Sequence, residues 1–172
     1  LSESDSMFES RRIKALTRRG FERTQAGDLG GFDDLAMAAD WIFEGTRSPA
    51  VLADAAGVLG ELVQGLALDG QHDRARFWLD RFRAELHVQF ESERIENVGH
   101  LLSQQLAMLA AVNAAVGDDE GALICAQNAV KVQRTIEETG GKPGVTTDVI
   151  LTSAALNHFL AGDLEQAAIL VQ

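Results

Sequence analysis

The sequence predicts an all-α fold, a solenoid of antiparallel helix hairpins, from three observations. A turn phrase, Gly-Asp-Leu-Glu-Gln-Ala at Gly162, is repeated in variant form at Gly117, Gly70 and, more weakly, Gly27. These glycines are 43, 47 and 45 residues apart, a period typical of stacked helix pairs. Between them, apolar residues recur at intervals of three and four, and β-branched runs are few, which favours helix. About four pairs, or seven to eight helices, are expected.

The individual helices follow from these turns and from start signals. Residues 2–6 form a polar lead-in. Four pairs are then expected at about 7–44, 49–88, 92–139 and 146–172. Their helices are expected at 7–26, 30–44, 49–69, 72–88, 92–116, 119–139, from 146 or 147 to 161, and from 163 onward.

Capping residues justify several of these boundaries. Asp28, Asp118 and Asp163 each follow a repeat glycine and can cap the next helix. Ser48-Pro49 combines a capping hydroxyl with a proline suited to a first helical position. Thr146 or Thr147 is expected to cap the seventh helix.

Composition limits the function classes. A chain of 172 residues suits a single domain over residues 1–172, with a real core. The net charge of −11 disfavours nucleic acid as a partner, because an acidic surface repels phosphates. The basic stretch 11–23 is expected to be a solvated helix face or a docking surface for an acidic neighbour.

The chain carries no sign of membrane insertion or export. A single cysteine, Cys125, excludes an internal disulfide and fits a reducing, cytoplasmic compartment. No apolar run approaches the ~20 residues of a membrane span, and no signal peptide is visible. The chain begins at Leu1 and ends in an apolar stretch, so we expect a fragment of a longer protein.

Four positions recur around the repeat glycines. Eleven residues before the glycine stand Leu16, Leu59, Leu106 and Leu151. Seven before it stand Gly20, Val63, Ala110 and Ala155. Five after it stand Phe32, Ala75, Ala122 and Ala167, and nine after it stand Ala36, Leu79, Ala126 and Val171.

This pattern resembles the tetratricopeptide repeat over about residues 8–172, in a long-repeat variant. Small residues let two helices approach, and large ones fill the gap to the next pair. The repeats exceed the family's usual ~34 residues, and the proline expected at the end of each pair is missing. Long variants of this kind resemble the sensor or scaffold regions of bacterial regulators.

The resemblance implies a binding face. In this family the first helix of each pair lines the concave side of the solenoid. The positions expected to bind a partner there are Lys14, Phe21, Gly57, Gly60, Gln64, Ala67, Gln104, Ala107, Ala111 and Phe159. The middle of such a face is lined by Gly and Ala and has room for an apolar helix or an extended peptide. The alternative is that other helices or tighter coiling fill this space.

No catalytic or metal-binding constellation is visible. The four histidines lack metal-ligand spacing, and Cys125 has no basic neighbour in sequence. No cofactor is expected. We therefore expect a non-enzymatic module that binds a protein or peptide. The alternatives are self-association through residues 169–171 or 49–69, and a small-molecule sensor with a pocket between Phe21, Gln64 and Gln104.

Overall fold

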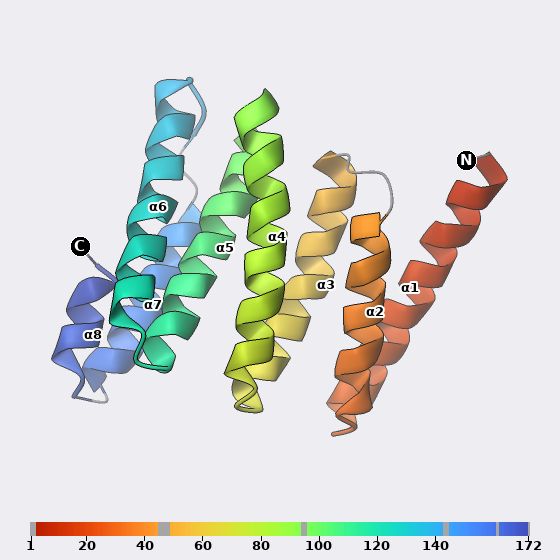
Figure 1. Cartoon of the computed structure of the whole chain (residues 1–172), viewed down its shortest axis with the longest axis horizontal. Coiled ribbons are helices and arrows are strands. Elements are labelled where there is room, and N and C mark those ends of the chain that lie inside the picture. The colour runs from red at the N-terminus through yellow and green to blue at the C-terminus, as the bar shows by residue number, and fades with distance from the viewer. Residues whose placement is uncertain (1–2, 45–48, 94–95, 143–144, 161, 172) are drawn as a thin grey trace. The chain divides into compact units, whose positions relative to one another are not determined.

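A computed structural model describes residues 3–44, 49–93, 96–142, 145–160 and 162–171 of the chain (Figure 1). These residues form eight helices and no strand, which confirms the predicted all-α class. The helices are α1 (Glu3–Gln25), α2 (Gly30–Glu44), α3 (Pro49–Leu68), α4 (His72–Glu93), α5 (Glu96–Ala115), α6 (Asp119–Glu138), α7 (Val145–Leu160) and α8 (Leu164–Ile169). None of the described helices combines the length and the apolar character needed to cross a membrane.

The chain divides into two compact units. Residues 1–71 contain α1 to α3, and residues 72–172 contain α4 to α8. In the first unit, α2 packs against both α1 and α3. In the second, α5 packs against α4, α6 and α7, and α8 lies against α7 and α6. The continuous solenoid and the single domain remain predictions.

Several expected boundaries were wrong, including the start of the fifth helix, which was expected at residue 92 and lies at Glu96 because residue 92 still belongs to α4. The polar lead-in belongs to α1, which begins at Glu3. Helix α4 continues to Glu93, beyond the expected residue 88, because Phe90 extends the buried stripe of Phe82 and Leu86 by one more turn. Neither Thr146 nor Thr147 occupies the cap position, since α7 already begins at Val145.

All four repeat glycines adopt the left-handed conformation that is typical of residues at the ends of helices. Their φ angles are 79° at Gly27, 76° at Gly70, 76° at Gly117 and 83° at Gly162. In each case the N–H of the next residue donates to the carbonyl four residues before the glycine, as Asp118 does to Asn113 at 2.9 Å. This is the Schellman motif, which glycine adopts without steric cost. Gly140, outside the repeat series, ends α6 in the same way.

Helices α1 and α2 run antiparallel and come very close to each other. A Cβ on Gly31 would lie 2.6 Å from the carbonyl oxygen of Gly20, and one on Gly20 would lie 2.7 Å from Leu35 Cγ. At the other end of the pair, the Arg12 guanidinium lies 4.0 Å from the centre of the Trp41 ring, a cation–π contact. The small residue expected seven positions before the glycine is therefore required here by the helix crossing.

A buried carboxylate joins these two helices near their turn. Asp34 on α2 accepts hydrogen bonds from Nε of Arg19 and from Nη1 of Arg23, both at 2.9 Å. The pKa of Asp34 is held below its usual range, chiefly by the hydrogen bond from Arg19. Arg23 also donates to Asp28 at 2.7 Å, and Asp28 accepts the Gly30 N–H at the start of α2, as its expected capping role requires.

The second unit is built around α5. Gly99 on α5 lies against Phe90 of α4 and Ile136 of α6, each within 3 Å of where its Cβ would be. Asp118 caps α6 as expected, accepting the Gly121 N–H at 3.0 Å. Glu96 at the start of α5 accepts the Lys142 N–H at 3.1 Å, and this bond is the main reason that the pKa of Glu96 is lowered.

Three buried polar side chains connect α5, α6 and α7. The hydroxyls of Ser103 and Thr147 lie 2.8 Å apart, and Gln133 Nε2 donates to both oxygens. Ser103 also lies 3.0 Å from the His100 carbonyl, to which it can donate. Buried polar groups are stabilising only when they are satisfied in this way.

Replacing Ser103 with alanine is expected to destabilise the second unit by about 1–3 kcal/mol, because Thr147 and Gln133 each lose a buried partner. Urea denaturation followed by the fluorescence of Trp78, the tryptophan of this unit, in a Trp41→Phe background measures the change. Ser153→Ala, at an exposed position of α7, is the control and is expected to stay within about 0.5 kcal/mol. Equal stabilities of the two variants would contradict the role assigned to the triad.

Candidate functional site

Most residues at the recurring positions are buried. All members of the series eleven before, seven before and five after the repeat glycines are buried, from Leu16 in the first repeat to Ala167 in the last. Burial is less regular at the position nine residues after the glycine. Val171 is 66% exposed, because α8 ends at Ile169.

The expected binding residues are distributed over both units. In the first unit, Lys14, Gly57 and Gln64 are exposed, and Phe21, Gly60 and Ala67 are half-buried. In the second unit, Gln104 and Ala111 are half-buried. Ala107 is fully buried, so the core of the second unit uses it for packing and it offers no surface to a partner. The side chain of Phe159 lies outside the described residues.

The glycines of α3 fall into two groups. A Cβ on Gly65 would lie 2.5 Å from the Phe32 ring, so packing within the first unit requires glycine there. Gly57 and Gly60 have no heavy atom within 4 Å of a Cβ position. Glycine inside a helix costs roughly 1 kcal/mol relative to alanine. The contacts of the described residues therefore do not explain two of the three glycines in this helix.

The described cysteine and histidine side chains lack the lowered thiol pKa and the ligand grouping that catalysis or metal binding would need. Burial raises the pKa of the Cys125 thiol, whereas a nucleophilic cysteine needs a lowered one. His100 and His158 each face one carboxylate, Glu96 at 3.4 Å and Asp163 at 3.6 Å. Within the described ranges, no three His, Cys, Asp or Glu side chains are grouped so that they could hold a metal ion.

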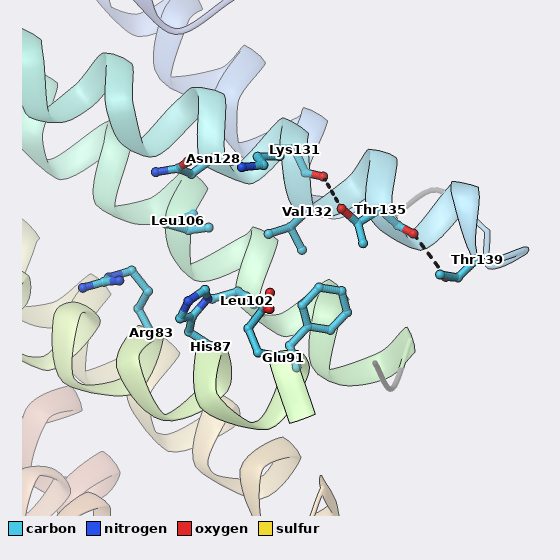
Figure 2. Close-up of a pocket in the computed structure, with 11 residues that line it drawn as sticks. Arg83, His87, Glu91, Leu102, Leu106, Asn128, Lys131, Val132, Thr135 and Thr139 are labelled. Atoms are coloured by element: carbon cyan, nitrogen blue, oxygen red, sulfur yellow. Dashed lines mark hydrogen bonds between the residues drawn. The ribbon is translucent and has the colours of Figure 1, made fainter. Parts of the chain in front are cut away.

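A cavity of about 670 Å³ lies in the second unit between α4 and α6, with α5 as its floor. We call it the α4–α6 cleft. Its lining residues are Arg83, His87, Phe90, Glu91, Leu102, Leu106, Asn128, Lys131, Val132, Thr135 and Thr139. Figure 2 shows Leu102 and Leu106 of α5 lying between the side chains of the two walls.

Sequence reasoning missed this cleft because it looked for a binding surface only on the first helices of the pairs. A signal was present nevertheless. Arg83, His87 and Glu91 follow one another at intervals of four on α4, and Asn128, Lys131 and Thr135 at intervals of three and four on α6. Such spacings place each set on one helix face.

A second cavity, of about 400 Å³, lies between α6, α7 and residues 169–171. These last residues were expected to form a self-association surface. Leu170 is buried, with 2% of its surface exposed, and Ile169 is half-buried. Of these three residues only Val171 is exposed, so residues 169–171 offer less apolar surface for self-association than was expected.

Comparison of the chain with protein-family models, curated proteins and solved structures gives no match. The class of the molecule is therefore defined by its own geometry. It is an all-α protein whose helices are separated by recurring glycine turns, with solvent-facing positions on α3 and a mixed apolar and charged cleft between α4 and α6.

Proposed function

We propose that the chain is a non-enzymatic protein-interaction module of the tetratricopeptide type, built from repeating helix pairs, that binds a peptide or helix of a partner protein. The recurring left-handed glycines and the burial of three of the four recurring positions support the repeat. In this proposal the first helices of the pairs form the recognition face.

The observation that carries the proposal is the pair Gly57 and Gly60 on α3. They are one helical turn apart, and no side chain or backbone of the described chain comes near the space that a Cβ would occupy. Bare backbone of this kind allows the close approach of a partner's backbone or helix. Gln64, exposed one turn further along, supplies an amide that can donate and accept hydrogen bonds.

Gly60→Arg is expected to weaken partner binding at least tenfold, because the arginine side chain would fill the bare surface. Proteins captured from an extract of the source cells with the wild-type chain would be purified, and their dissociation constants measured by fluorescence anisotropy. Ala84→Arg, which places the same side chain at an exposed position of α4, is the matched control and should bind like the wild type. Unchanged affinity of the Gly60→Arg variant would exclude this face.

Self-association is a second candidate, favoured by exposed apolar residues in the second unit. Val149 and Leu156 are both exposed and lie two turns apart on α7, on one face of the helix. Large exposed apolar surface is typical of interaction sites. Light scattering over a range of concentrations separates this candidate from the first, since a mass that stays at one chain would exclude it.

A further inference from the structure

Helix α1 is a basic helix at one edge of the first unit (Figure 1). Its stretch 11–23 holds six arginines and lysines against one acid, Glu22, although the chain as a whole has a net charge of −11. Among the described helices, α1 packs substantially against α2 alone. Much of the surface of α1 is therefore not covered by its own unit.

Three of the six cations hold α1 on α2. Arg19 and Arg23 donate hydrogen bonds to the buried Asp34 of α2. Arg12 lies over the Trp41 ring of the same helix, 4.0 Å from its centre. The charges of these three arginines are therefore engaged within the unit.

The other three cations, Arg11, Lys14 and Arg18, form what we call the α1 basic row. All three are exposed, and they follow one another at intervals of three and four residues, which places them on one face of the helix. Arg18 is ion-paired with Glu22, one turn further along, at 2.8 Å. Among the side chains that the structure describes, none forms an ion pair with Arg11 or Lys14. These two charges are therefore available to a partner.

A half-buried stripe borders the basic row. Its members, Ile13, Thr17 and Phe21, follow at intervals of four residues. Lys14 precedes Thr17 by three residues and Arg18 precedes Phe21 by three, so the row and the stripe are neighbours on the helix surface. The Thr17 hydroxyl donates to the Ile13 carbonyl at 2.9 Å and needs no partner from outside. The surface thus combines apolar contact with a cationic border.

An acidic amphipathic helix fits this surface better than a polyanion or a bilayer does. A nucleic acid carries a phosphate at every nucleotide and would meet Glu22 at the end of the row, whereas a helix can place an uncharged residue there. The net charge of −11 also repels a long polyanion more than a short peptide, because charges beyond about 8 Å are screened. A bilayer takes up protruding apolar side chains, whereas Ile13 and Phe21 are half-buried.

We propose that the α1 basic row and the stripe beside it dock an acidic amphipathic helix of a partner protein. The partner's carboxylates lie against Arg11 and Lys14, and its apolar side chains lie against Ile13 and Phe21. Because the row is exposed, the affinity falls as the salt concentration rises. The inference rests on the proposed function in that the partner is a protein, but it uses a different helix from the bare surface at Gly60 on α3.

A fluorescein-labelled helical peptide tests the proposal on the intact chain by fluorescence anisotropy. Its leucines and glutamates lie on one side of the helix, each set spaced by three and four residues. At low salt it is expected to bind saturably, and about tenfold more tightly than the same peptide with lysine in place of glutamate. A peptide of equal composition whose glutamates lie opposite the leucines should bind about fivefold more weakly, because the two sets then cannot meet α1 together.

Lys14→Glu is expected to weaken binding of the glutamate peptide about tenfold and to strengthen binding of the lysine peptide. Lys131→Glu is the matched control, since it makes the same change in net charge at an exposed position of α6 in the second unit. It should change the affinity for the glutamate peptide less than about twofold. Both variants should keep the wild-type midpoint of urea denaturation, because neither lysine is buried.

Gly60→Arg separates this inference from the proposed function, and it should leave binding of the glutamate peptide unchanged. Loss of binding on Gly60→Arg but not on Lys14→Glu would place the peptide on α3, which would support the proposed function and overturn this inference. The inference is also overturned if the peptide shows no saturable binding, or if Lys14→Glu and Lys131→Glu have equal effects. Tighter binding of single-stranded DNA or of vesicles containing anionic lipid would overturn it as well.

Discussion

Replacing Arg19 and Arg23 together with methionine is expected to lower the free energy of unfolding at neutral pH, and by more than the removal of Asp34 does. The double change leaves the Asp34 carboxylate, whose side chain is only 7% exposed, without its two charged partners. Methionine keeps most of the apolar stem of arginine, so the loss reports on charge rather than on packing. Urea denaturation followed by Trp41 fluorescence, in a Trp78→Phe background, measures the first unit alone.

The reverse change is expected to cost less. Asp34→Ala leaves behind Arg19 and Arg23, whose side chains are 58% and 38% exposed, so water can hydrate their charges. Its cost is expected to be about 1–3 kcal/mol, the value of hydrogen bonds to a charged group. A loss on Asp34→Ala as large as that of the double arginine variant would contradict this asymmetry.

The effect of the arginines should depend on pH in a defined direction. The folded-state pKa of Asp34 is lowered, so its contribution is present above its unfolded pKa of about 3.9 and is lost as pH falls through the folded value. Without the arginines, burial raises the pKa of Asp34 instead. The variant then regains stability as the carboxyl takes up a proton. The difference between wild type and variant should therefore be larger near pH 7 than near pH 4.5.

The sequence predicted the helix-ending turns well because they are local. A left-handed glycine and its hydrogen bonds depend on a handful of consecutive residues, and the glycine period marked four of the five turns of this kind in the part of the chain that the structure describes. The fifth, at Gly140, lies outside the period. Leu59, Leu106 and Ala110, which stand at recurring positions before these glycines, are buried.

The sequence did not predict contacts that depend on how helices cross. Asp34 follows Asp33 in what reads as a first-turn acid pair, but its neighbour Asp33 is exposed whereas Asp34 is buried against two arginines of α1. The Ser103–Gln133–Thr147 triad joins three helices from positions up to 44 residues apart. Such pairings need the interhelical geometry, which periodicity does not contain.

The candidate binding surfaces likewise divide into features that the sequence predicted and features that depend on how the helices cross. The exposure of Gly57 and Gln64 followed from the repeat register. The burial of Ala107 did not, because α5 is covered by α4, α6 and α7 and has little free surface. The α4–α6 cleft depends on the separation of two helices that both pack on α5, and no single-helix pattern specifies that separation.

Gly31→Ala and Gly57→Ala, the same chemical change in two helices of one unit, are expected to have opposite effects. At position 31 the new methyl group would lie 2.6 Å from the Gly20 carbonyl and 2.7 Å from the Thr24 nitrogen. Because these neighbours are backbone atoms of α1, the helices must move apart, at a cost of about 3 kcal/mol. At position 57 the methyl meets no neighbour, and the greater helix propensity of alanine should stabilise the unit by about 0.5–1 kcal/mol.

The same Trp41 assay measures both variants, and Gly65→Ala provides an intermediate case. There the added methyl would lie 2.5 Å from the edge of the Phe32 ring, a side chain that can shift further than a backbone, so a loss between the other two is expected. A stabilised Gly57→Ala variant with weakened partner binding would show that glycine at this position serves recognition at the expense of folding. If Gly57→Ala instead lost stability, position 57 would have a packing role, and the argument for a recognition face on α3 would fail with it.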